Sequence, residues 1–85
     1  MMRPFEPAYS QEAVEAMLAA DSRKRTRART LVLQLCRTPG REGDYQAVDR
    51  NGQVWEVTLI DGMIVTYRTD HAVRELRIAT IEWVE

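Results

Sequence analysis

Two short turn signals after residue 50 constrain the fold of this chain most. Asn51-Gly52 and Asp61-Gly62 each lie between runs of strand-forming residues. Loops of two residues with these sequences favour type I′ turns, in which both central residues have positive φ. We therefore expect an antiparallel meander of four strands at about 44–49, 53–60, 63–69 and 72–85.

The strands alternate apolar and polar residues, which predicts one face against a core and one wetter face. In the last strand Leu76 and Ile78 share one parity, whereas Ile81 and Trp83 share the other. Such a break in parity indicates a β-bulge or a strand end near Ala79-Thr80.

Two helical segments precede the sheet. Residues 3–9 contain two prolines and suit only an edge strand, because proline cannot donate a ladder hydrogen bond. Ser10 is the expected N-cap of a first helix that ends near Asp21-Ser22. The spacing of Val14, Met17 and Leu18 predicts its buried stripe, with Ala13 beside them.

The second helix is expected at about 23–37 and ends before Pro39-Gly40. The short link between the helices predicts an αα-hairpin. Leu33 falls outside the apolar stripe, so we expect it to be partly exposed. The stripe consists of Ala28, Leu31, Val32, Leu35 and Cys36.

Composition indicates a single α+β domain over residues 1–85, 45% hydrophobic and 29% charged. Cys36 is the only cysteine, which excludes an internal disulfide, and no metal-ligand spacing or phosphate loop occurs. We therefore expect no metal and no cofactor. The chain shows neither a signal-peptide core nor the ~20 apolar residues of a membrane span, so we expect a cytoplasmic protein without a membrane partner.

Charge is divided unevenly along the chain. Residues 1–41 hold 8 basic and 4 acidic side chains, and residues 42–85 hold 4 basic and 9 acidic ones. The run from Ser22 to Arg29 supplies five of these cations and is a candidate site for phosphate or an acidic partner, although a solvated helix turn explains it as well. The candidate residues are Arg23, Lys24, Arg25, Arg27 and Arg29.

A second set of candidates lies on the last hairpin. His71 is the only histidine, and this residue type suits an acid or a base, although the polarity of the turn explains it as well. Three arginines flank it and could line a groove for a phosphodiester backbone, or else pair with Glu56 and Glu75. The candidate catalytic residues are Arg68, His71, Arg74 and Arg77. Trp55 and Trp83 are either base-stacking platforms or core and interface anchors.

Residues from 4 to 82 resemble, in order and spacing, the RelE/ParE family of bacterial toxin–antitoxin toxins. Residues 5–13 look like its first strand and helix, residues 23–35 followed by Pro39 like its second helix, and residues 62–67 with Asp70 and Arg77-Ile78 like its central hairpin. The resemblance implies a β-α-α-β-β-β(-β) fold, a cognate antitoxin that wraps the toxin, and often ribosome-dependent mRNA cleavage. Gyrase inhibition is the alternative activity within the superfamily.

Two departures from the family concern basic positions. Ile64 stands where many members place an arginine, and the basic positions of the preceding strand fall near Glu56 and Thr58. Our first hypothesis is a toxin-fold protein of a toxin–antitoxin pair that acts on the ribosome and its mRNA but lacks typical catalytic basic residues. The alternatives are a non-catalytic interaction module, self-associating as a homodimer or paired with a partner, and a small nucleic-acid-binding regulator.

Overall fold

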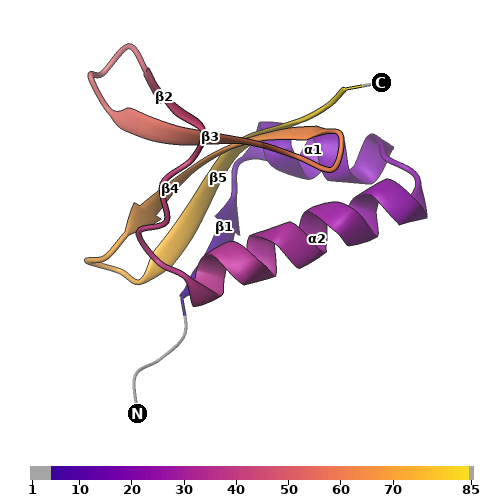
Figure 1. The fold of residues 1–85 in the computed structure, drawn as a ribbon, viewed down its shortest axis with the longest axis horizontal. Coiled ribbons are helices and arrows are strands. Elements are labelled where there is room, and N and C mark those ends of the chain that lie inside the picture. The colour runs from indigo at the N-terminus through magenta and orange to yellow at the C-terminus, as the bar shows by residue number, and fades with distance from the viewer. Residues whose placement is uncertain (1–4, 85) are drawn as a thin grey trace.

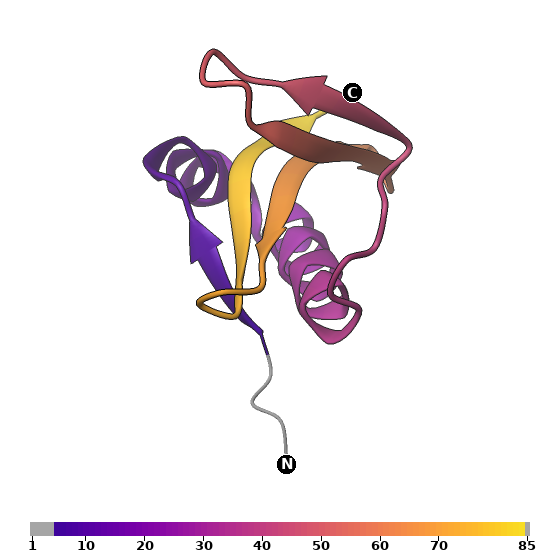
Figure 2. The ribbon, with the colours of Figure 1, turned by 90° about the vertical axis from the view of Figure 1, so that its left-hand side faces the viewer.

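The computed structural model describes residues 5–84 as a five-stranded sheet with two helices on one face (Figure 1). Its elements are β1 (Glu6–Tyr9), α1 (Gln11–Ala19), α2 (Ser22–Arg37), β2 (Tyr45–Val48), β3 (Val54–Ile60), β4 (Met63–Asp70) and β5 (Glu75–Trp83). The strand order is β1-β5-β4-β3-β2, and in Figure 2 the central strands lie in front of both helices. No described helix is long and apolar enough to cross a membrane.

The four-stranded meander is confirmed, since each of β2, β3 and β4 pairs antiparallel with the next strand along the chain. β1 is an edge strand, as expected, although positions 3 and 4 of its expected range lie outside the described residues. Its direction was not predicted. β1 runs parallel to β5, from Glu6 beside Glu75 to Tyr9 beside Ile78.

The two hairpin turns differ. Asp61 and Gly62 have φ of 51° and 75°, which confirms the type I′ turn there. The same prediction for Asn51-Gly52 is wrong, because only Gly52 has positive φ. Gly52 N–H donates to the Asp49 carbonyl, giving a type I turn followed by a left-handed glycine. The Asp49 carboxylate holds this longer loop by accepting from the N–H groups of Asn51 and Gln53.

The last strand begins later than predicted. Residues 71–74 form a loop instead of extending β5, because the Asp70 carboxylate accepts from the N–H groups of Ala72 and Val73 and Arg74 adopts φ of 56°. At the other end, the predicted Glu85 lies outside the described residues.

The bulge is confirmed at Ala79. The register passes from Thr66 beside Thr80 to Tyr67 beside Ile78, which leaves Ala79 without an opposing residue on β4. The Ser10 hydroxyl donates to the Ala79 carbonyl at 2.6 Å and accepts from an α1 N–H. The predicted N-cap thus also ties α1 to the bulge.

The core lies between the helices and the inner face of β4 and β5, and the predicted α2 stripe is fully buried. Cys36 belongs to this core, and burial raises the pKa of its thiol. The predicted α1 stripe is only half right. Met17 is buried with Ala13, whereas Val14 is 41% and Leu18 71% exposed. Leu33 is 48% exposed, as expected.

Candidate functional site

The face of the sheet that points away from the helices carries two of the predicted catalytic residues, Arg68 and Arg77, together with Trp55. Met63, Val65 and Tyr67 of β4 lie in the core, so their neighbours point to the opposite side. We call that side the outer face. Its central residues are Trp55, Val57 and Leu59 of β3, Ile64, Thr66 and Arg68 of β4, and Arg77, Thr80 and Glu82 of β5.

Arg68, Arg77 and Trp55 form a row across this face. Arg68 and Arg77 are cross-strand partners on β4 and β5. The guanidinium carbon of Arg68 lies 5.6 Å from the centroid of the Trp55 ring, within cation–π range. The Trp55 indole N–H donates to the Asp49 carboxylate at 2.9 Å, which fixes the orientation of the ring. That hydrogen bond, with those from Gln53 and Asn51, lowers the pKa of Asp49.

Carboxylates border the row on one side. Arg77 lies 3.4 Å from Asp70 and 3.6 Å from Glu75, so the expected pairing with Glu75 is confirmed. The Glu56 carboxylate instead accepts from the Gly43 N–H and the Gln46 amide. The Arg77 side chain is 44% exposed, so these ion pairs are weak and exchangeable. In contrast, Nε of Arg68 is buried and has no hydrogen-bond partner among the described residues.

The remaining outer-face positions are uncharged or acidic. Thr66 lies between Val57 and Thr80 in the next row, and Ile64 lies between Leu59 and Glu82 in the row after that. Ile64 therefore interrupts the face where the resemblance implied an arginine. Within residues 5–84, the central positions of the outer face carry cations only in the row of Arg68 and Arg77.

The other two predicted catalytic residues lie in the β4–β5 loop and contact Phe5. The His71 ring packs edge-on against Phe5 at 5.4 Å, and the Arg74 guanidinium carbon lies 4.6 Å from the same ring. Phe5 is buried, so both side chains help to cover the start of β1. His71 and Arg68 also border one hollow of about 200 Å³, together with Arg41.

The cations of the basic run on α2 make several different contacts within the chain. The Arg25 guanidinium donates to the carbonyls of Met17, Leu18 and Ala20 at the end of α1.

Arg27 donates to the Asp61 carbonyl in the β3–β4 turn, at 3.0 Å. Lys24 Nζ lies 5.8 Å from the Trp83 ring centroid. Arg23 and Arg29 are exposed. The run thus holds secondary-structure ends together in addition to presenting charge.

Sequence reasoning missed the Asp49–Trp55–Arg68 arrangement. The signal was available in the strand alternation, which puts Trp55 and Arg68 on one face once the Asp61-Gly62 turn fixes the register. The participation of Asp49 depended on the loop conformation and had no local signal. No cluster of three or more metal-ligating side chains occurs within residues 5–84.

Comparison with known proteins identifies similar structures but no family by sequence. No family model and no curated protein matches this chain. The RelBE2 toxin–antitoxin complex of Mycobacterium tuberculosis contains a chain that superimposes with a TM-score of 0.76 at 16% identity, covering 95% of this chain and 99% of that one.

Two Escherichia coli structures are also similar. The isolated RelE toxin gives a TM-score of 0.68 at 10% identity, covering 95% of this chain and 85% of that one. The intact RelBE toxin–antitoxin complex gives 0.64 at 11% identity, covering 95% and 98%. The chain therefore has the α+β fold of RelE toxins.

Proposed function

We propose that this chain is the toxin-fold component of a toxin–antitoxin pair and that it acts on RNA through the outer face. The observation that carries the proposal is the row of Arg68, Arg77 and Trp55. Paired guanidinium groups suit phosphate oxygens, and a half-buried indole with one accessible side suits base stacking. A strand of RNA laid along this row exchanges the Asp70 and Glu75 contacts of Arg77 for phosphate contacts.

The site of action in this proposal is the ribosome and its mRNA in the cytoplasm, with a cognate antitoxin as the neutralising partner. Solved chains of similar fold are described as members of toxin–antitoxin complexes, which supports the partner. The proposal also includes cleavage of the bound mRNA. Cleavage requires His71 to reach the RNA from the hollow that it shares with Arg68.

Induced expression in a bacterial host tests the proposal. We expect growth arrest that co-expression of the neighbouring gene product relieves. Arg68→Gln combined with Arg77→Gln should abolish the arrest, whereas Arg37→Gln, on an exposed turn of α2, should leave it unchanged. Harmless expression of the unaltered chain, with intact ribosome-bound mRNA, would contradict the proposal.

A second candidate function is a non-catalytic interaction module with the same fold. It is favoured by the row of Leu59, Ile64 and Glu82, which is apolar and acidic and carries no cation for RNA. The packing of His71 and Arg74 on Phe5 also favours it, because both side chains then have a structural role. This candidate predicts growth arrest or partner binding without any RNA cleavage, or a self-associated species in light scattering without RNA affinity.

The nucleic-acid-binding regulator, which relies on the α2 run, is the least favoured hypothesis, because Arg25 and Arg27 already bind backbone carbonyls of this chain.

A further inference from the structure

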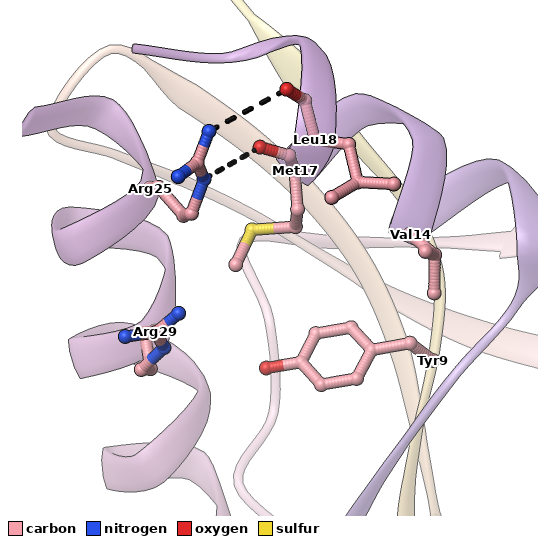
Figure 3. Close-up of a pocket in the computed structure, with 6 residues that line it drawn as sticks. All are labelled: Tyr9, Val14, Met17, Leu18, Arg25 and Arg29. Atoms are coloured by element: carbon pink, nitrogen blue, oxygen red, sulfur yellow. Dashed lines mark hydrogen bonds between the residues drawn. The ribbon is translucent and has the colours of Figure 1, made fainter. Parts of the chain in front are cut away.

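The guanidinium group of Arg68 lacks the acceptors that a half-buried arginine normally has. Its Nε is buried and has no hydrogen-bond partner among the described residues, while its guanidinium carbon lies over the Trp55 ring. Arg25 shows the usual arrangement, since its donors meet the carbonyls of Met17 and Leu18 at the end of α1 (Figure 3). A buried donor without an acceptor costs free energy, so we expect Arg68 to meet an acceptor from outside the chain.

A hollow of about 200 Å³ beside Arg68 gathers further donors. Its lining comes from β3, the end of β4, the loop after α2 and the β4–β5 loop, and it includes the side chains of Arg41 and His71. Thr69 lines it too. Because the Thr69 hydroxyl accepts from the Gly40 N–H at 3.2 Å, its own proton is left to donate. We call the hollow between Arg41, Arg68, Thr69 and His71 the basic hollow.

Contacts within the chain hold the donors of the basic hollow in place. The Arg41 carbonyl accepts from the Tyr67 hydroxyl at 3.0 Å, and the Arg41 N–H donates to the Thr38 carbonyl at 3.1 Å. The His71 ring packs edge-on against Phe5. A bound anion therefore has fewer groups to order than it would on a mobile loop, which favours binding.

The charge and donor geometry of the basic hollow suit a phosphate group. Glu56 also lines it, but the two carboxylate oxygens accept from the Gly43 N–H and the Gln46 amide, both at 2.9 Å. With His71 neutral, two arginines and one glutamate leave a charge of +1 on the lining. Donors from separate segments converge there, and the several oxygens of a phosphate can meet more of them than the two of a carboxylate.

We propose that the basic hollow binds one phosphate group, and that in RNA this phosphate belongs to a nucleotide next to the base stacked on Trp55. Arg68 joins the two positions, because it lies over the Trp55 ring and also lines the hollow. The hollow is separate from the rest of the row, since neither Trp55 nor Arg77 lines it. Only the assignment of the phosphate to RNA rests on the proposed function.

A nuclear magnetic resonance titration of the full chain tests the proposal. We expect sodium phosphate to give saturable shifts of the Gly40 N–H and Trp55 indole N–H resonances, which sodium chloride at the same ionic strength and pH does not reproduce. Two dinucleotides, one with a 5′-phosphate and one with a 5′-hydroxyl, then identify the source of the group. Tighter binding of the first assigns the hollow to a terminal phosphate, and equal binding assigns it to the internal phosphodiester.

Matched variants locate the bound phosphate. Arg41→Gln should weaken phosphate binding about threefold to tenfold, whereas Arg50→Gln, which removes the same charge from an exposed turn outside the hollow, should leave it unchanged. His71→Phe keeps a ring against Phe5 but removes the N–H donor, so it should also weaken binding. Arg68→Lys should retain part of the affinity, because an ammonium group keeps the charge and loses the fork of donors. Circular dichroism should show that all four variants are folded.

Three results would overturn the proposal: no saturation with phosphate, equal shifts with chloride, or equal losses for Arg41→Gln and Arg50→Gln. Failure of the proposed RNA function is measured separately with Arg77→Gln, which should weaken RNA binding and leave phosphate binding unchanged. Phosphate binding in a chain without RNA affinity would remove the RNA function and keep the phosphate site.

Discussion

Arg25 should stabilise the end of α1 through its guanidinium group, although it belongs to the basic run of α2 that the sequence predicted as a candidate binding site. α1 has nine residues and no basic residue in its last turn, and a helix of this length is marginal by itself. Nε and Nη2 of Arg25 donate to the carbonyls of Met17 at 2.9 Å and Ala20 at 2.8 Å, and Nη2 also lies 3.4 Å from the Leu18 carbonyl. The Met17 carbonyl also accepts from the Ala20 N–H at 3.3 Å, whereas the Leu18 and Ala20 carbonyls lie at the helix end, beyond the reach of the helix's own N–H groups.

The change Arg25→Ala removes all three contacts. Hydrogen bonds to charged groups contribute ~1.5–3 kcal/mol when water is excluded, and we take about half of that for each short bond because the site is only part-buried. With ~0.5 kcal/mol from the helix dipole, the free energy of unfolding should fall by about 2–3.5 kcal/mol. For a chain of this size, Tm should then fall by ~10 °C or more.

Circular dichroism during heating and urea titration measure the loss. Arg23→Ala is the matched control, because Arg23 is exposed on the same helix and the change should alter stability by less than ~0.5 kcal/mol. Arg25→Lys should give an intermediate result, since an ammonium group cannot reproduce the fork of donors. Equal losses for Arg25→Ala and Arg23→Ala would refute the assignment of Arg25 to the α1 end.

Three further predictions concern the sheet. Gly43→Ala should destabilise the chain by ~2 kcal/mol or more in urea titration, because a Cβ there would lie 2.5 Å from the Val57 carbonyl oxygen; a neutral result would show that the loop moves freely. Tyr67→Phe should cost ~1 kcal/mol in the same assay, since the hydroxyl of this buried residue donates to a loop carbonyl at 3.0 Å; an unchanged midpoint would contradict that. The lowered pKa of Asp49 means that its stabilising contribution is present above the ordinary carboxyl pKa and is lost as pH falls through the lower folded value. The Trp55 indole N–H resonance should therefore shift only below about pH 4, and Asp49→Asn should remove that transition; a shift centred near neutral pH would be inconsistent with the hydrogen bond.

Local patterns predicted much of the fold. The Asp61-Gly62 turn and the N-cap at Ser10 depend on residues adjacent in sequence, so short-range rules identify them. The bulge at Ala79 followed from a break in apolar parity. The parallel pairing of β1 had no such signal, because it depends on where the helices return the chain.

Errors arose where contacts outside the short sequence pattern decided the outcome. Asn51-Gly52 follows the hairpin rule, but the Asp49 carboxylate selects a longer loop. The α1 pattern indicated three buried residues, whereas the sheet covers only the side of the helix that carries Met17. Helical periodicity gives the apolar width of a helix but not how much of it the same chain buries.

The candidate site was predictable only in part. Arg68 and Arg77 were both expected, and the strand register places them side by side. The contacts of His71 and Arg74 with Phe5 join residues far apart in sequence, and no spacing rule reports them. The α2 run was correctly seen as a cluster of cations, but the long reach of Arg25 to α1 could not be read from composition.

Binding of a fluorescent single-stranded RNA, measured against salt concentration, tests the central claim that the outer face is the RNA site. Arg68→Gln with Arg77→Gln should weaken binding at least ~10-fold and make it less dependent on salt, and Trp55→Ala should weaken it while leaving the salt dependence unchanged. Arg23→Gln with Arg37→Gln removes the same charge from α2 and should have little effect. Equal losses from the two charge-matched pairs, or no RNA binding by the unaltered chain, would contradict the account.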